Sequence, residues 1–337
     1  MTHYDLPLAE LRQFRPEVRE PADFDAFWER TVNDARAAGG DVVLEPVDNP
    51  LPHVDIFDVT FPGYGGQPIK GWLVRPAGVD GPLPVIVHYV GYGGGRSLAI
   101  EHTFWAAAGF AYFVMDSRGQ GSAWGNGGGT ADPEGSGPSH PGFMTRGIES
   151  PDSYYYRRVF TDAVRAVDAV RTMPGIDPTR VAVHGASQGG GIALAVAALV
   201  PDVQAACIDV AFLCHYERAV ALTDQHPFGE IQQFLRIHRD RVDDALRTLS
   251  YFDGVNFARR AHVPSLWSVA LMDNIVPPST TFAAFNWYGS YVDGAESDSD
   301  RANEVVKAME VYPYNGHEGG EWRQIEKQRA FLVAQLA

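Results

Sequence analysis

Residues 181–200, VAVHGASQGGGIALAVAALV, place a serine between a strand pattern and a helix pattern. The segment 181–187 is a near-continuous apolar run, typical of a parallel strand buried on both faces. Small and aliphatic residues from 189 onward predict a helix. Between them lies G-x-S-x-G, the pattern of a sharp strand-to-helix turn in which glycines leave room for a strained serine. We therefore expect Ser187 to be exposed at the carboxyl end of a sheet.

The same alternation of strand and helix patterns extends to both sides of this stretch. Apolar runs typical of buried parallel strands recur, with helix patterns between them. The strand runs are 84–90, 110–116, 181–187, 205–213, 265–273 and 308–314, and the helix patterns are 100–108, 156–173, 189–200 and 321–335. Because strands alternate with helices, the sequence predicts an α/β fold with a mostly parallel, doubly wound sheet.

Three segments depart from this alternation. Residues 21–38 carry aromatic residues at helical spacing, and 54–76 has the alternation and glycines of a hairpin. Residues 214–262 lie between two strand runs and contain helical stretches at 228–238 and 241–250, which indicates an inserted helical lid. We expect one domain over 1–337, with an N-terminal extension (1–40) and a helical insertion (214–262).

Composition excludes several classes of protein. The chain has 337 residues, of which 45% are hydrophobic and 20% are charged, so it can bury a full core and is not wholly disordered. No window approaches the length of a membrane span. The formal net charge of −15 repels polyanions, so nucleic acid is not an expected partner. Residues 1–20 lack the apolar core of a signal peptide, which makes the cytoplasm the expected location.

A serine hydroxyl is a weak nucleophile, so Ser187 needs a base, and the base needs an acid to orient it. Where such a turn carries a catalytic serine, the acid and then the histidine follow later in the chain. Asp273 ends the strand run 265–273, and His317 follows the run 308–314. Asp209 also ends a strand run and is the alternative acid. The remaining histidines are interpreted as core, surface or lid residues.

Acyl transfer also needs donors for a developing oxyanion. One is expected to be the backbone N–H of Gln188, the residue after the serine. The other is expected to be the N–H of Tyr92, in the glycine-rich segment GYGGG (91–95). The alternative for that segment is a simple flexible loop, and it lacks the G-K-[ST] of a phosphate loop. No metal or other cofactor is predicted, because His317-Glu318 does not continue as H-E-x-x-H and Cys207 and Cys214 are expected to be small buried hydrophobes.

At this point the chain resembles a known family, the acetyl xylan esterases and cephalosporin C deacetylases of carbohydrate esterase family 7, which have the α/β-hydrolase fold. The resemblance rests on three motifs and runs from DLPLAELRQF (5–14) to the final helix. The motifs are Arg118-Gly119-Gln120-Gly121-Ser122, GASQGG (185–190) and His317-Glu318, supported by GFMTRGI (142–148) and YYYRRVFTDAVRAVDAVR (154–171).

The resemblance implies Ser187 as nucleophile, Asp273 as acid, His317 as base, and the N–H groups of Tyr92 and Gln188 as oxyanion hole. We interpret the motif around Arg118 as scaffolding, because a guanidinium has five donors with which to tie loops together. Two positions depart from the family pattern, Val90 where histidine is frequent and Ala211 where proline is frequent. Both are expected to border the pocket and to affect substrate preference.

The resemblance also implies a homohexamer, a trimer of dimers with active sites facing an inner cavity. Aromatic and aliphatic residues in 1–38 and 214–262 exceed what one sheet needs, so we expect them to be covered in such an assembly. These residues are Phe24, Phe27, Trp28, Phe228, Phe234, Leu235, Tyr251 and Phe252. The alternative is that they pack only on their own domain.

Three functions are consistent with the sequence. The first is a serine esterase that removes acetyl groups from small alcohols, acetylated xylo-oligosaccharides and acetylated cephalosporins. The second is a serine peptidase, because GASQGG also resembles the elbow of the prolyl oligopeptidase group, although no propeller-like repeats precede it. The third is a non-catalytic binding protein on the same fold, against which the intact set of catalytic residue types argues.

Overall fold

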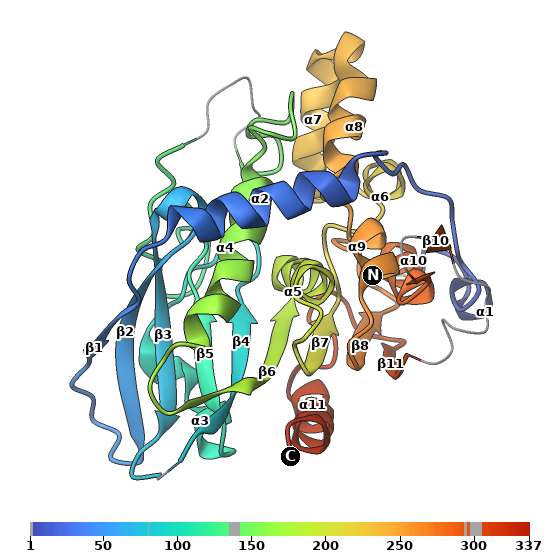
Figure 1. Ribbon diagram of the computed structural model, residues 1–337. Helices are drawn as coiled ribbons and strands as arrows, with labels where there is room; N and C mark the ends of the chain where they lie inside the picture. The colour runs from blue at the N-terminus through green and yellow to red at the C-terminus, as the bar shows by residue number, and fades with distance from the viewer. Residues whose placement is uncertain (1–2, 80, 135–141, 293–294, 297–304) are drawn as a thin grey trace.

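The computed structural model describes residues 3–79, 81–134, 142–292, 295–296 and 305–337. Within these residues nine strands form one sheet in the order β1-β2-β3-β5-β4-β6-β7-β8-β11 (Figure 1). From β5 to β11 all neighbours are parallel, whereas β1, β2 and β3 pair antiparallel at one edge. The strands are β1 Val43–Pro46, β2 Val54–Pro62, β3 Pro68–Pro76, β4 Leu83–Tyr89, β5 Ala111–Met115, β6 Ile176–Ala186, β7 Ala205–Asp209, β8 Ser265–Ala270 and β11 Lys307–Tyr312.

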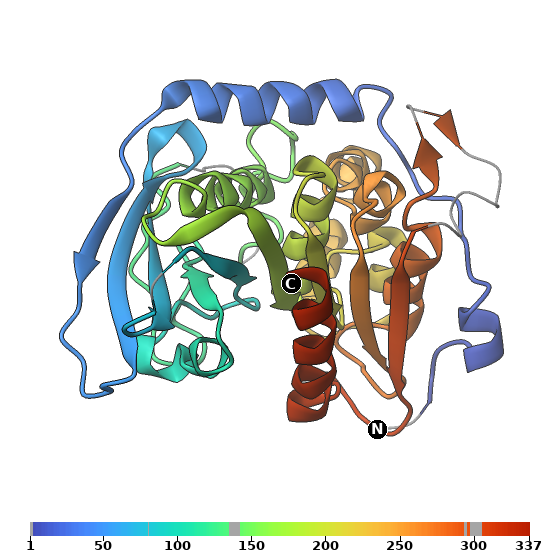
Figure 2. The same cartoon turned by 60° about the horizontal axis from the view of Figure 1, so that its bottom comes forward.

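Helices cover both faces of this sheet (Figures 1 and 2). Successive side chains of a strand point to opposite faces, so Val85 and Val87 join the core under α4 and α5, while Ile86 joins the core under α3 and α11. The helices are α1 Leu8–Leu11, α2 Phe24–Ala38, α3 Phe104–Ala107, α4 Tyr155–Val170, α5 Gln188–Leu199, α6 Tyr216–Leu222, α7 Phe228–Ile237, α8 Val242–Ser250, α9 Gly254–Arg260, α10 Pro278–Trp287 and α11 Glu321–Gln335. The predicted doubly wound α/β sheet is thus confirmed.

Local predictions differ from the structure at a few places. The stretch 100–108, predicted as one helix, is two short pieces, a 3₁₀ turn at Ala99–His102 and α3. The edge strand β1 and the helices α6, α9 and α10 were not predicted from the pattern. Helix α9 is apolar on the side that packs against α5, so part of the insertion 214–262 belongs to the main core and is not a lid. The division of the chain into one domain with an extension and an insertion stays a prediction.

The N-terminal helix α2 joins two distant parts of the chain. The ring of Trp28 stacks on Phe160 of α4 with centroids 5.8 Å apart, and its centroid lies 5.5 Å from that of Phe252, between α8 and α9 of the insertion. The Trp28 indole N–H donates to the carbonyl oxygen of Tyr251 at 2.9 Å. Figure 2 shows α2 lying across the helices that cover this face.

This packing corrects one expectation about assembly. Seven of the eight side chains predicted to need a partner surface are buried within the chain itself, and Leu235 is half-buried against the same core. The aromatic residues of α2 contact Tyr251, Phe252 and Phe257, whereas Phe228 packs on Phe212, so these side chains do not argue for an oligomer. Among the described residues, no helix is both long and apolar enough to span a membrane.

Candidate active site

Ser187 occupies the sharp turn between β6 and α5. Its backbone has φ 57° and ψ −121°, a conformation that a non-glycine residue adopts only where the surroundings enforce it. Neither flanking glycine position has room for a side chain. A Cβ on Gly185 would lie 2.3 Å from the backbone of Gly189, and a Cβ on Gly189 would lie 2.1 Å from the carbonyl oxygen of Tyr89. The predicted elbow is present, with its serine at the carboxyl end of the sheet.

The structure brings His317 and Asp273 to this serine. His317 Nε2 lies 2.9 Å from Ser187 Oγ, and His317 Nδ1 lies 2.7 Å from Asp273 Oδ2. The other oxygen of Asp273 accepts hydrogen bonds from the backbone N–H groups of Ile275 and Val276, each at 2.9 Å. Asp273 is only 1% exposed, so these contacts hold its carboxylate in one orientation toward the imidazole.

His317 lies on a turn that Glu318 folds. The Glu318 carboxylate accepts from the Asn315 side chain at 3.0 Å and from the Gly316 N–H at 3.1 Å. Glu318 itself is exposed and points its charge at the turn. The His-Glu pair therefore combines a side chain aimed at Ser187 with one that shapes the loop carrying it.

Asp209, the alternative acid, has different partners. Its carboxylate accepts from Ser268 Oγ at 2.7 Å and from Gln324 Nε2 at 3.0 Å, and lies 4.0 Å from His184. Burial raises the pKa of Asp209 to about 6. The geometry places Asp273, not Asp209, against His317.

Two of the histidines that were not assigned to catalysis pair with each other. His88 Nδ1 and His184 Nδ1 are 2.9 Å apart on neighbouring strands. Burial lowers the pKa of His184 to about 4, and burial together with His184 lowers the pKa of His88. Both rings are therefore neutral at pH 7, which lets one nitrogen donate and the other accept.

The expected oxyanion donors lie on two segments joined by side-chain amides. Within the described residues, the N–H groups of Tyr92 and Gln188 donate to no backbone carbonyl. Gln120 bridges the two segments, because its Oε1 accepts from the Gly93 N–H at 2.7 Å and its Nε2 donates to Gln188 Oε1 at 2.9 Å. Gln188 Nε2 donates in turn to the carbonyl oxygen of Val90 at 3.0 Å. These side-chain hydrogen bonds thus hold the GYGGG segment and the turn at Ser187 next to each other.

Tyr92 is anchored at its other end by the insertion. Its hydroxyl donates to Glu230 Oε1 at 2.6 Å and accepts from the Phe143 N–H at 2.7 Å. The second Glu230 oxygen accepts from the Met144 N–H at 3.1 Å. Burial and the Glu230 charge raise the pKa of Tyr92, so the hydroxyl stays protonated. The GYGGG segment is therefore an anchored structure and not a simple flexible loop.

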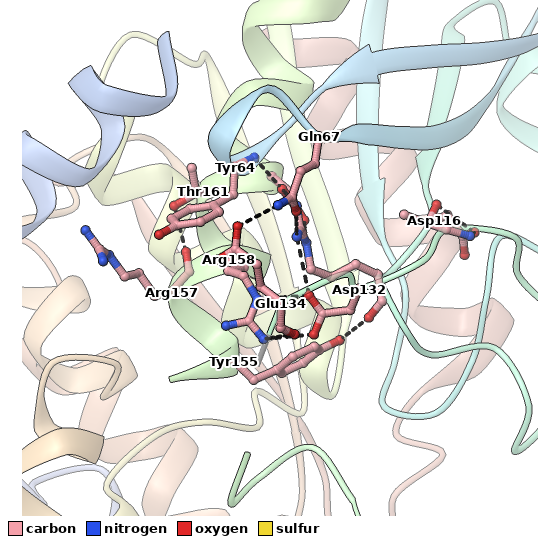
Figure 3. Close-up of polar contacts among 12 residues, drawn as sticks. Tyr64, Gln67, Asp116, Asp132, Glu134, Tyr155, Arg157, Arg158 and Thr161 are labelled. Carbon is pink, nitrogen blue, oxygen red and sulfur yellow. Dashed lines mark hydrogen bonds and ion pairs between the residues drawn. The ribbon is translucent and has the colours of Figure 1, made fainter. Parts of the chain in front are cut away.

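Arg118 has the scaffolding contacts that its motif predicts. The guanidinium is fully buried and donates two hydrogen bonds to Asp162, at 2.5 and 2.7 Å. It also donates to Gln67, and it lies 3.4 Å from Asp132, which pairs with Arg158. Figure 3 shows Gln67, Asp132 and Arg158 converging in this cluster.

The rest of the motif connects this cluster to the elbow. The Tyr155 hydroxyl donates to the carbonyl oxygen of Arg118 at 2.5 Å, and Gln120 Nε2 lies 3.0 Å from that hydroxyl. Gly119 and Gly121 have φ values of 70° and 107°, which turn the chain so that Gln120 faces Gln188. Arg118 fixes the backbone, and Gln120 links it to the two segments that carry the expected oxyanion donors.

The bridging amide leads to a prediction. Gln120→Leu keeps the volume but removes the hydrogen bonds to Gly93, Gln188 and Tyr155, so we expect kcat on an acetyl ester to fall on the order of tenfold to a hundredfold, with KM little changed. Gln67→Leu is the matched control, since it disturbs the Arg118 cluster without touching Gly93 or Gln188. Steady-state kinetics and thermal unfolding of both variants separate the effects. Lower stability with full kcat in Gln120→Leu would contradict the prediction.

A cavity of about 440 Å³ opens onto Ser187 and His317. Most of the residues that line this cavity were not predicted from the sequence, because they come from loops and strand ends with no shared motif. The additional lining residues are His88, Tyr89, Gly91, Trp124, Ala186, Val210, His226, Pro227 and Ile275.

Within the described part of the chain, no three His, Cys, Asp or Glu side chains are grouped as a metal ion would need. Cys207 and Cys214 are free thiols and fully buried, as predicted for small hydrophobes.

The two departures from the family pattern differ in position. Val90 lines the cavity, as expected. Ala211 is fully buried under the elbow, where a Cβ on Gly190 would lie 3.4 Å from its Cα, and it is not among the described lining residues. The expectation that Ala211 borders the pocket is wrong, because the chain turns its neighbour Val210 toward the cavity instead.

Nearly the whole chain matches one protein family, whose model is described as acetyl xylan esterase (AXE1) and matches residues 1–335. The chain belongs to the acetyl xylan esterase (AXE1) family. Acetyl xylan esterase from Paenibacillus sp. R4 is similar in structure, with a TM-score of 0.88 and 37% identity over 98% of this chain and 100% of that one. Acetyl xylan esterase 1 from Thermoanaerobacterium sp. JW/SL YS485 has a TM-score of 0.86 and 30% identity, over 99% and 100% of the two chains.

These matches confirm both the resemblance carried by the three motifs and the α/β-hydrolase fold. Among curated proteins, acetyl esterase Axe7A from Xylanibacter ruminicola is 29% identical over 292 residues. The match covers 81% of this chain and 61% of Axe7A, so the chain spans about three fifths of the length of that curated relative.

Proposed function

We propose that this protein is a serine esterase that removes acetyl groups from small alcohols, including acetylated xylo-oligosaccharides. The observation that carries the proposal is the hydrogen-bonded series Ser187–His317–Asp273 at the floor of an accessible cavity. Membership of the acetyl xylan esterase family supports acetyl as the acyl group.

The proposed reaction uses each group in turn. Ser187 Oγ attacks the acetyl carbonyl carbon while His317 Nε2 takes its proton, and Asp273 stabilises the imidazolium through Nδ1–H. The carbonyl oxygen becomes an oxyanion between the N–H groups of Tyr92 and Gln188. The C–O bond to the alcohol breaks, His317 protonates the departing oxygen, and acetyl-Ser187 remains. Water, deprotonated by His317, then attacks the acetyl group and releases acetate.

The acetyl ester of cephalosporins is a further candidate substrate from the same resemblance. A panel of p-nitrophenyl esters from acetyl to octanoyl, with acetylated xylobiose and an acetylated cephalosporin beside it, tests the proposal. We expect the acetyl esters to be cleaved fastest. No turnover of any acetyl ester by the wild-type protein would reject the esterase proposal.

Two other functions are tested by simple additions to that panel. A serine peptidase on this fold would cleave peptide amides, and a non-catalytic binding protein would fail to react with an active-serine phosphonate. The hydrogen-bonded geometry at Ser187 argues against the non-catalytic binding protein, because a protein without catalysis has no need to hold its serine in a strained turn against His317.

We also propose that the protein forms a hexamer, a trimer of dimers whose active sites face an inner cavity, as the family resemblance implies. Exposed apolar residues near the tip of the α7–α8 hairpin offer a contact surface, since Ile237 is 64% exposed and Val242 is 36% exposed. Light scattering is expected to give a particle near six times 36.8 kDa, and acetate release should be far faster from xylobiose esters than from acetylated polymer. A monomer, or equal rates on polymer and oligomer, would reject the enclosed cavity.

A further inference from the structure

Trp124 presents an indole ring beside the reacting groups. It lines the same cavity as Ser187 and His317, yet it is 52% exposed. Exposed apolar side chains are common on protein surfaces, so it is the place of the Trp124 ring in the cavity, and not its exposure alone, that bears on what covers it. Its position on the wall of the cavity, and not on a remote surface, indicates that the cover is a ligand.

The ring is held in place before any ligand arrives. The Trp124 indole N–H donates to the carbonyl oxygen of Tyr92 at 2.7 Å. The ring lies directly on glycine backbone, because a Cβ on Gly94 would be 2.3 Å from its Cζ2 and a Cβ on Gly93 would be 3.7 Å from its Nε1. Any side chain at Gly94 would displace the indole. The glycines of this loop thus serve a second purpose, which is to seat an aromatic platform.

The cavity is much larger than the acyl group of the proposed reaction. A volume of about 440 Å³ lies in the range that encloses a ring-sized ligand, and an acetyl group fills only a small part of it. The remaining space must therefore receive the alcohol part of the ester. An alcohol that covers an indole face needs a flat apolar surface of its own.

The charge of the cavity narrows the chemistry of that alcohol. Among the described residues that line the cavity, none is lysine or arginine, and the titratable ones are His88, His226, His317 and two tyrosines. The chain as a whole carries a formal charge of −15. The described lining therefore offers the alcohol apolar contact and hydrogen bonds, and no fixed positive charge.

We propose that Trp124 is the stacking platform for the sugar ring that carries the acetyl ester. A pyranose has an apolar C–H face that matches an indole and hydroxyl groups at its rim that stay solvated. The inference rests on the proposed esterase function and adds to it the residue that recognises the alcohol. Trp124 acts as a specificity residue and takes no part in proton transfer.

The test compares two substrates in three proteins. The substrates are an acetylated methyl xyloside and ethyl acetate, whose alcohol is too small to cover the ring. The proteins are the wild type, Trp124→Ala, which loses the ring, and Trp124→Phe, which keeps a ring but loses the hydrogen bond to Tyr92. The measured quantity is the ratio of kcat/KM for the xyloside to kcat/KM for ethyl acetate.

We expect Trp124→Ala to lower that ratio on the order of tenfold, and Trp124→Phe to keep it within about threefold of wild type. If Trp124 only supports Tyr92, both substrates will fall together in both variants and the ratio will stay constant, which would overturn the inference. A ratio that falls in Trp124→Phe as much as in Trp124→Ala would also overturn it.

A binding measurement gives a second readout that does not depend on turnover. In a Ser187→Ala background, calorimetry with methyl xyloside acetate is expected to show Kd weakened on the order of tenfold when Trp124→Ala is added. Equal Kd values would contradict the platform. Wild-type protein that hydrolyses neither ester would reject the esterase proposal itself, whereas hydrolysis of both with a constant ratio would reject only the role of Trp124.

Discussion

Ser187→Ala is expected to lower acetyl-ester turnover by several orders of magnitude while the fold stays intact. In the proposed reaction the hydroxyl oxygen forms the bond to the acetyl carbon, so no neighbouring group replaces it, and the residual rate comes from binding and the proposed oxyanion donors alone. Removal of one oxygen from a side chain beside an open cavity leaves no buried space unfilled. Kinetics with p-nitrophenyl acetate, together with circular dichroism and thermal unfolding, measure both parts of the prediction.

Ser153→Ala is a suitable control, because it removes an exposed hydroxyl outside the cavity. It should keep wild-type activity and should still react with an active-serine phosphonate, whereas Ser187→Ala should not. Activity above about a tenth of wild type in Ser187→Ala, in a preparation free of contaminating esterase, would end the serine-esterase proposal.

Asp273→Asn has the second largest expected effect, a loss on the order of 10⁴-fold in kcat. The carboxylate now accepts from His317 Nδ1 at 2.7 Å while its other oxygen is held by the N–H groups of Ile275 and Val276. An amide in the same place keeps one oxygen on those backbone donors and turns its NH₂ toward the histidine. The imidazole then places its proton on Nε2, where it cannot accept from Ser187.

Asp209→Asn is the matched control, since it makes the same change in a buried aspartate that ends a neighbouring strand. Ser268 and Gln324 donate to that carboxylate, so replacing it costs about 1–3 kcal/mol of stability through unpaired donors, with kcat within a few-fold of wild type. Thermal unfolding and kcat of the two variants distinguish Asp273 from Asp209 as the acid. If Asp209→Asn lost catalysis and Asp273→Asn lost only stability, the assignment of the acid would be wrong.

Short-range patterns in the sequence determined most of the strands and helices of the sheet, and the turn that carries Ser187. Apolar runs of strand length, helix patterns between them and the G-x-S-x-G turn depend on residues a few positions apart, so they can be recognised without knowledge of the fold. The order of the partners along the chain pointed to Asp273 and His317 because a parallel sheet brings the ends of successive strands to one edge. Helix 100–108 was mispredicted because its apolar residues suit two short turns as well as one helix.

Tertiary structure decided which of these groups meet and what supports them. Asp209 is the last residue of β7, and Asp273 lies three residues after β8. Only the course of the chain turns the carboxylate of Asp273 to His317 and that of Asp209 to Ser268 and Gln324. The bridge from Gln120 to Gln188 joins residues 68 positions apart, and that from Trp28 to Tyr251 joins residues 223 apart. Such contacts leave no periodic trace in the sequence, because each is made by a single pair of side chains. For the same reason, whether an aromatic ring closes a core, as Trp28 does, or lines a cavity, as Trp124 does, depends on burial that only the folded chain determines.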